Sequence, residues 1–158
     1  SRKPNRSFYH WGAMAAAQRF ATTRDPGFLE FLRKQADYFF DQVEERLSAD
    51  GNHCADMEGL AATLAVLNRS GEIDTARARQ IRTWLSNEAA KLPRLQIQPG
   101  QVGISLGGEV QFHAPRMSEF PGAFLLGLNR TSTRVDAAQH CLSAMITIER
   151  DRLQIPPK

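Results

Sequence analysis

Apolar residues between positions 26 and 47 recur at steps of three and four, the spacing of one face of an α-helix. Charged residues fill the opposite side. This is the clearest amphipathic pattern in the chain, and it predicts a long helix that buries one face against its neighbours. The buried face is expected to comprise Leu29, Leu32, Ala36, Phe39, Val43 and Leu47.

Other stretches also carry helix signals. Alanine, a strong helix former, dominates residues 8–23, and Asp25 followed by Pro26 marks the start of the next helix. Short connections make successive helices antiparallel neighbours. The further predicted helices are residues 55–69, 74–92 and 133–152, together with a short buried helix at 120–128, where the chain is apolar almost all round.

The period changes to two near residue 101, where Val102, Ile104 and Leu106 alternate with smaller or polar residues. Gly107 and Gly108 supply a turn, so residues 101–113 are expected to form a β-hairpin that lies over the helices. The predicted fold is mainly α, with antiparallel helical hairpins of about six helices and this one inserted β-hairpin. A single domain is expected at residues 8–152, between a flexible N-terminal segment (1–7) and a C-terminal tail (153–158).

Composition excludes some functions. The 158 residues suit one compact domain, and the formal charge is only +3, with basic residues spread along the chain. Nucleic-acid binding is not predicted, because a basic patch or stripe is its usual footprint. No membrane span is predicted either, because no apolar run approaches about 18 residues.

Cys54 and Cys141 fit neither a disulfide framework nor a zinc ribbon. We expect two buried free thiols, with pairing in an oxidising compartment as the alternative. Metal-ligand residue types occur together at His53, Cys54, Asp56 and Glu58, but their spacing matches no standard site. No metal and no cofactor are therefore predicted.

If the helices alternate up and down, the starts of the first, third and fifth helices meet at one end. This arrangement predicts a polar cleft with an aromatic platform, and such a cleft suits sugars, whose ring faces are apolar and whose edges carry hydroxyls. The residues expected there are His10, Trp11, Asn52, His53, Glu58, His113 and Arg116. A competing set at the start of the sixth helix, expected at the opposite end, comprises Arg134, Asp136 and His140.

The candidate catalytic residues are Glu58 as a general acid or base and His10 or His53 as its partner. The alternative, which we favour, is that Glu58 is a first-turn glutamate stabilised by the helix dipole. Trp11 is either a sugar platform or a core residue, and Arg116 either binds an acidic group or is a solvated loop residue.

Asp136 has a second interpretation, because residues 133–136 have the spacing of a capping box with aspartate in place of the usual glutamate. We favour capping for this residue. The His-Cys pairs at His53–Cys54 and His140–Cys141 would serve a thiol or metal site only if the fold brought the right atoms together.

Residues 9–17, followed by residues 23–40, resemble the helical hairpins of (α/α)-toroid carbohydrate enzymes, and residues 134–145 are similar to late helices of such toroids. These families include glycoside hydrolases, polysaccharide lyases and sugar epimerases. The resemblance implies an inner helix, a turn and an outer helix that recur around a barrel. This chain would form half of such a barrel, a C-terminal fragment of one, or an independent domain of helical hairpins. It implies no catalytic residue, because the families differ in theirs.

Two functions are therefore expected as alternatives. The first is a carbohydrate-active protein that binds or processes an oligo- or polysaccharide, including an acidic one. The second is a non-catalytic helical interaction module that completes its burial as a homo-oligomer or against a missing partner domain.

Overall fold

The structure is a computed structural model that describes residues 9–106 and 110–153. Three predicted features lie outside the described residues. They are the flexible segment (1–7), the turn at Gly107 and Gly108, and all but the first residue of the tail (153–158).

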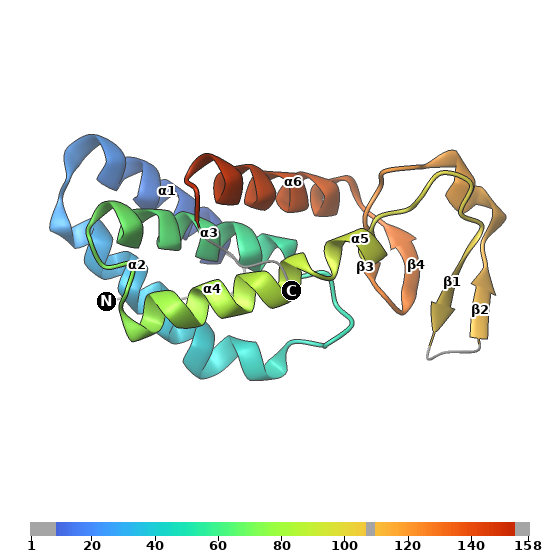
Figure 1. Ribbon diagram of the computed structural model, residues 1–158, viewed down its shortest axis with the longest axis horizontal. Coiled ribbons are helices and arrows are strands. Elements are labelled where there is room, and N and C mark those ends of the chain that lie inside the picture. The colour runs from blue at the N-terminus through green and yellow to red at the C-terminus, as the bar shows by residue number, and fades with distance from the viewer. Residues whose placement is uncertain (1–8, 107–109, 154–158) are drawn as a thin grey trace.

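Most of the described chain is helical, and the strands gather at one end (Figure 1). The helical elements are α1 (Tyr9–Thr23), α2 (Pro26–Tyr38), which continues through a π-helical turn η2 (Phe39–Val43) and a 3-10 turn η3 (Glu44–Arg46), α3 (Cys54–Arg69), α4 (Ala76–Ala89), α5 (Leu92–Leu95) and α6 (Val135–Arg150). The remaining elements are strands β1 (Gly103–Leu106), β2 (Val110–His113), β3 (Leu125–Gly127) and β4 (Arg130–Thr133), and a 3-10 turn η4 (Pro115–Glu119). The predicted mainly α fold with an inserted β-hairpin is confirmed.

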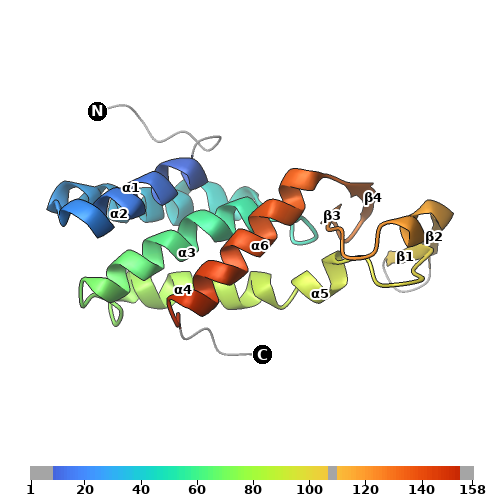
Figure 2. The same ribbon diagram turned by 90° about the horizontal axis from the view of Figure 1, so that it is seen from above.

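Helix α3 is the centre of the fold. It packs against α1, α2, α4 and α6, and Figure 2 shows it between its neighbours. Because it has neighbours on several sides, it is apolar nearly all round, as expected for a buried helix. Its buried residues are Cys54, Met57, Glu58, Gly59, Leu60, Ala61, Thr63, Leu64, Ala65, Val66 and Leu67.

Gly59 allows α1 to approach α3 closely. A Cβ atom at this position would lie 2.7 Å from a ring carbon of Tyr9 and 3.0 Å from the Cα atom of His10. Further along, Phe20 of α1 packs with Val66 of α3, so the two helices run in the same direction. The glycine thus sets the distance between α1 and α3, and with it the position of His10.

The predicted helix at 120–128 is wrong, because this stretch contains β3, which pairs with β4 in a second antiparallel hairpin. Apolar periodicity alone cannot distinguish a short buried strand from a buried helix segment. Backbone bonds decide the outcome: the Asn52 N–H donates to the Leu126 carbonyl at 3.1 Å, and the Leu128 N–H donates to the Asp50 carbonyl at 2.7 Å. Gly122 also has a positive φ of 87°, which a right-handed helix excludes.

This hairpin reverses the expected direction of α6. A disulfide joins Cys54, the first residue of α3, to Cys141 in the first half of α6, and Arg69 pairs with Asp151 at the far ends of the two helices. The two helices therefore run in the same direction. None of the helices in the described ranges is both long and apolar enough to cross a membrane.

Candidate functional site

Side chains from α1, α3 and α6 form a His–Glu–His cluster, which comprises His10, Glu58 and His140. The Nδ1 atom of His140 lies 2.9 Å from Oε2 of Glu58, and the rings of His10 and His140 meet edge to face with centroids 4.8 Å apart. Only 3% of Glu58 is exposed. A carboxylate so far from water requires a hydrogen-bond partner, and His140 supplies it.

His10 lies at the edge of this cluster with one nitrogen unsatisfied. Its Nε2 atom is buried and has no hydrogen-bond partner among the described residues. Burial lowers the pKa of His10, the nearby His140 lowers it further, and the Glu58 carboxylate opposes both effects. These surroundings therefore favour the neutral form of the His10 imidazole.

The exposure of Trp11 shows that it is not a core residue, which is one of the two alternatives that the sequence leaves open. Its relative exposure is 48%. Its ring centroid lies 4.8 Å from that of His10 and 5.8 Å from that of His140. The indole is thus held against the cluster while nearly half of its surface faces solvent. This is the placement that a stacking platform requires.

A small polar cleft lies beside His140, with a volume of about 140 Å³. It brings together residues that the sequence predicts at opposite ends of the bundle. We call it the Asn52–His140 cleft, and it is lined by Asn52, Cys54, Ala55, Leu126, Arg134, Asp136, Ala137 and His140. Asn52 is held in place, because its side chain donates to the Leu125 carbonyl at 2.8 Å and accepts from the Cys54 N–H at 3.0 Å.

The capping box predicted at residues 133–136 is wrong. Thr133 ends β4, and α6 begins after Arg134, which makes no side-chain cap. Asp136 instead pairs with Arg134 at 2.6 Å, with side chains 45% and 65% exposed. Exposed pairs of this kind contribute little to stability, so a ligand can reorganise this one at low cost.

His53 is placed away from the cluster, although it is only a few residues before Glu58. It is buried, and its Nδ1 atom lies 3.1 Å from Oε2 of Glu88 on α4. Burial raises the pKa of Glu88, but hydrogen bonds from His53 and Lys91 outweigh burial and lower it overall. In this structure His53 ties the start of α3 to α4.

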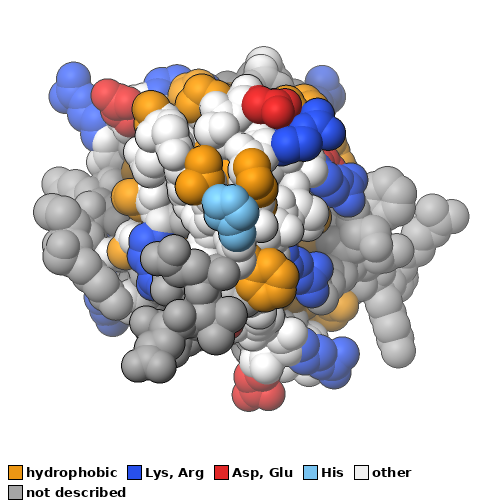
Figure 3. Space-filling model, turned by 90° about the vertical axis from the view of Figure 1, so that its right-hand side faces the viewer, with side chains coloured by type: hydrophobic (Ala, Val, Ile, Leu, Met, Phe, Trp, Pro, Cys, Tyr) orange, Lys and Arg blue, Asp and Glu red, His pale blue; other side chains and the backbone are white. Residues whose placement is uncertain are grey.

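The β1–β2 end of the molecule holds the remaining two predicted site residues. His113 ends β2 and is exposed, and Arg116 lies in η4 within 3.4 Å of Glu119. Figure 3 shows this end, where hydrophobic side chains are interspersed with acidic and basic ones. Because η4 and the second hairpin replace a fifth helix, His113 and Arg116 do not line the Asn52–His140 cleft.

The expectation of two free thiols is wrong, because Cys54 and Cys141 form a disulfide. Neither cysteine is then a thiolate nucleophile or a thiolate metal ligand. The thiol or metal site considered for the two His-Cys pairs is therefore not formed.

His140 was expected at the opposite end from Glu58, and this is also wrong. The reason is the second hairpin, which returns the chain to the end where α3 starts. The cysteines carried a signal for this contact: Glu58 lies one helical turn after Cys54, and His140 directly precedes Cys141. A disulfide between the cysteines would have placed the two side chains together.

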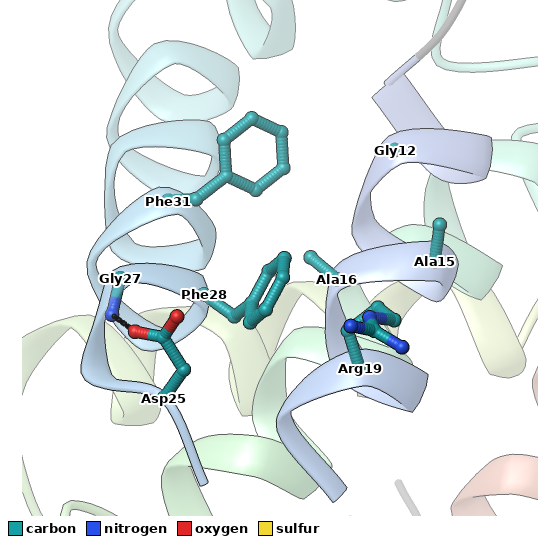
Figure 4. Close-up of a pocket in the computed structure, with 8 residues that line it drawn as sticks. All are labelled: Gly12, Ala15, Ala16, Arg19, Asp25, Gly27, Phe28 and Phe31. Atoms are coloured by element: carbon teal, nitrogen blue, oxygen red, sulfur yellow. Dashed lines mark hydrogen bonds between the residues drawn. The ribbon is translucent and has the colours of Figure 1, made fainter. Parts of the chain in front are cut away.

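A larger and more apolar groove separates α1 from α2 (Figure 4). Its volume is about 490 Å³, and Phe28 and Phe31 of α2 face α1 across it. The polar groups at its rim are already engaged: Asp25 accepts from the Gly27 N–H at 2.8 Å and caps α2 as predicted, and Arg19 lies over the Phe28 ring. The groove therefore provides a concave apolar surface, but the polar side chains at its rim are already engaged in other contacts.

Protein-family models, curated proteins and solved structures were each compared with the chain, and none of the three comparisons gives a match. The resemblance to (α/α)-toroid enzymes consequently stays a prediction that rests on the sequence segments themselves.

Proposed function

We propose that the protein binds an oligo- or polysaccharide on the surface formed by Trp11 and the Asn52–His140 cleft. The observation that carries this proposal is the half-exposed indole beside a polar cleft. The apolar face of a sugar ring packs on an aromatic face, while its hydroxyls need hydrogen-bond partners at the edge. The cleft supplies those partners close to the indole, because His140 lines the cleft and its ring centroid lies 5.8 Å from that of Trp11.

The size of the cleft limits how a saccharide would bind. At about 140 Å³ it is smaller than most ligand-binding clefts and cavities, whose volumes are roughly 300–1,000 Å³. A sugar would therefore lie over Trp11 with one polar substituent entering the cleft. Arg134, which is exposed and paired only with Asp136 among the described residues, is suited to the carboxylate of an acidic sugar.

If the protein also processes its saccharide, Glu58 would act through His140. Glu58 is buried and does not line the cleft, whereas His140 does. The carboxylate would fix the orientation of the imidazole that meets the ligand. His53, His113 and Arg116 have no part in this proposal.

Replacing Trp11 by alanine is expected to weaken saccharide binding at least about tenfold, or ~1.4 kcal/mol, because the stacking surface is lost. Neutral and acidic oligosaccharides are screened by thermal shift, since a ligand of the native state raises the melting temperature. Phe31→Ala is the matched control, because Phe31 is also an exposed aromatic residue, 40% exposed, but lies on α2. Equal affinity of Trp11→Ala and wild type, or no shift with any sugar, contradicts the proposal.

The second candidate function is a helical assembly module, and the outer face of α6 favours it. Val135, Leu142, Met145 and Ile146 are 89%, 53%, 46% and 60% exposed. The last three share one face of the helix, since they are spaced by three and four residues. Exposed apolar groups that lie together often mark an interaction surface.

An assembly module is expected to associate as its concentration rises, and the double variant Leu142→Ser/Ile146→Ser is expected to remain a monomer. Sedimentation of both proteins over a concentration series measures this difference. A wild-type mass of 17.7 kDa at every concentration argues against self-association.

A further inference from the structure

We propose that the His–Glu–His cluster binds a divalent transition-metal ion of the zinc type. One ligand atom each from His10, Glu58 and His140 lies within 4.8 Å of the others, and the Nδ1 atom of His140 is 2.9 Å from the Glu58 carboxylate. Zinc bonds to nitrogen and oxygen are about 2.0–2.2 Å long, so tetrahedral ligands are about 3.3 Å apart. The cluster therefore needs side-chain movements of about an ångström or less to close around an ion.

The unsatisfied nitrogen of His10 is an independent reason to expect a ligand. A buried polar atom without a partner costs about 1–3 kcal/mol, and coordination of Nε2 to a metal ion would remove that cost. The close approach of α1 to α3 at Gly59 holds the backbone of His10 at this position. The backbone that carries the orphaned atom is thus fixed by packing.

The donor set selects the class of metal. Two imidazoles and one carboxylate suit zinc, iron and related ions, whereas calcium and magnesium prefer oxygen ligands. A set of three protein ligands also leaves a coordination position for water or another molecule. The proposal does not depend on saccharide binding, because the stacking role of Trp11 requires no metal.

The test uses untagged, disulfide-bonded protein that has been treated with a chelator and dialysed. Zn²⁺ is titrated by calorimetry, and Co²⁺ is titrated while its visible absorption spectrum reports the coordination geometry. We expect one ion per chain, a dissociation constant on the order of 1 μM or below, and a melting temperature that rises with metal concentration. Absence of binding by both ions overturns the proposal.

Variants locate the site. His10→Ala is expected to weaken Zn²⁺ binding at least about tenfold, and His113→Ala is the matched control because His113 is an exposed histidine on β2. Glu58→Gln keeps the shape of the side chain but removes the anionic ligand, and it should weaken binding similarly. If the Glu58 variant does not fold, the Zn²⁺ affinity of His10→Ala and the Co²⁺ spectrum of the wild type test the assignment of the site. Unchanged affinity of His10→Ala, or an equal loss in His113→Ala, shows that the ion binds elsewhere and overturns the assignment.

Discussion

Replacing both Cys54 and Cys141 by serine is expected to lower the free energy of unfolding by about 4–5 kcal/mol. The bond joins residues separated by 87 positions, so in the chain-entropy description it restricts more than half of the unfolded chain. For a chain of this size, such a loss lowers the melting temperature by roughly 10–20 °C. Thermal and urea unfolding of the oxidised wild type and the double variant measure the difference.

A reducing agent provides the control. It should destabilise the wild type toward the level of the double variant, and it should leave the double variant unchanged. Equal stability of oxidised wild type and double variant would show that the bond is absent or without effect.

The second large effect is expected for Phe39→Ala, which should cost about 3–5 kcal/mol of stability. Phe39 is fully buried, and its ring lies 5.6 Å from Tyr9, 5.1 Å from Phe40 and 5.0 Å from Trp84, measured between centroids. Truncation removes these ring contacts and leaves a cavity among elements that cannot fully collapse. Urea unfolding monitored by circular dichroism measures the change.

Phe31→Ala is the appropriate comparison, because the same atoms are removed from a residue that is 40% exposed. Its expected cost is below about 1 kcal/mol. Phe39→Leu should be intermediate, since it restores part of the volume. Similar costs for Phe31→Ala and Phe39→Ala would contradict the placement of Phe39 at the centre of the aromatic core.

These two experiments also bear on the site, because they test the contacts that hold it together. The disulfide fixes α6 against α3 at the residue next to His140. Phe39 packs on Tyr9, the residue before His10, and so supports the start of α1. Loss of metal or saccharide binding in these variants would therefore report disturbed positioning, whereas loss in His10→Ala or Trp11→Ala reports a missing contact.

Much of the helical fold was predictable because its signals are local. The cap and proline at Asp25 and Pro26, and the apolar period of α2, each depend on residues within a few turns of one another. The β1–β2 hairpin was predictable for the same reason, since apolar residues alternate on both sides of Gly107 and Gly108 in the sequence. The stretch at 120–128 failed because a short, wholly apolar run has no period, and its conformation is decided by bonds to Asp50 and Asn52, which are more than seventy residues away in the chain.

By itself, the sequence determined most of the helical segments, and it singled out Trp11, Glu58 and His10 as candidate site residues near helix starts. Only the tertiary structure decided that His140 joins Glu58, that His53 turns to Glu88, and that the cysteines pair. These contacts depend on the direction in which each helix runs. Because the β3–β4 hairpin takes the place of a predicted helix, α6 runs in the opposite direction to the one predicted. Helix propensity is determined by a few neighbouring residues. The end of the bundle at which a side chain lies depends instead on every turn that reverses the chain direction before it.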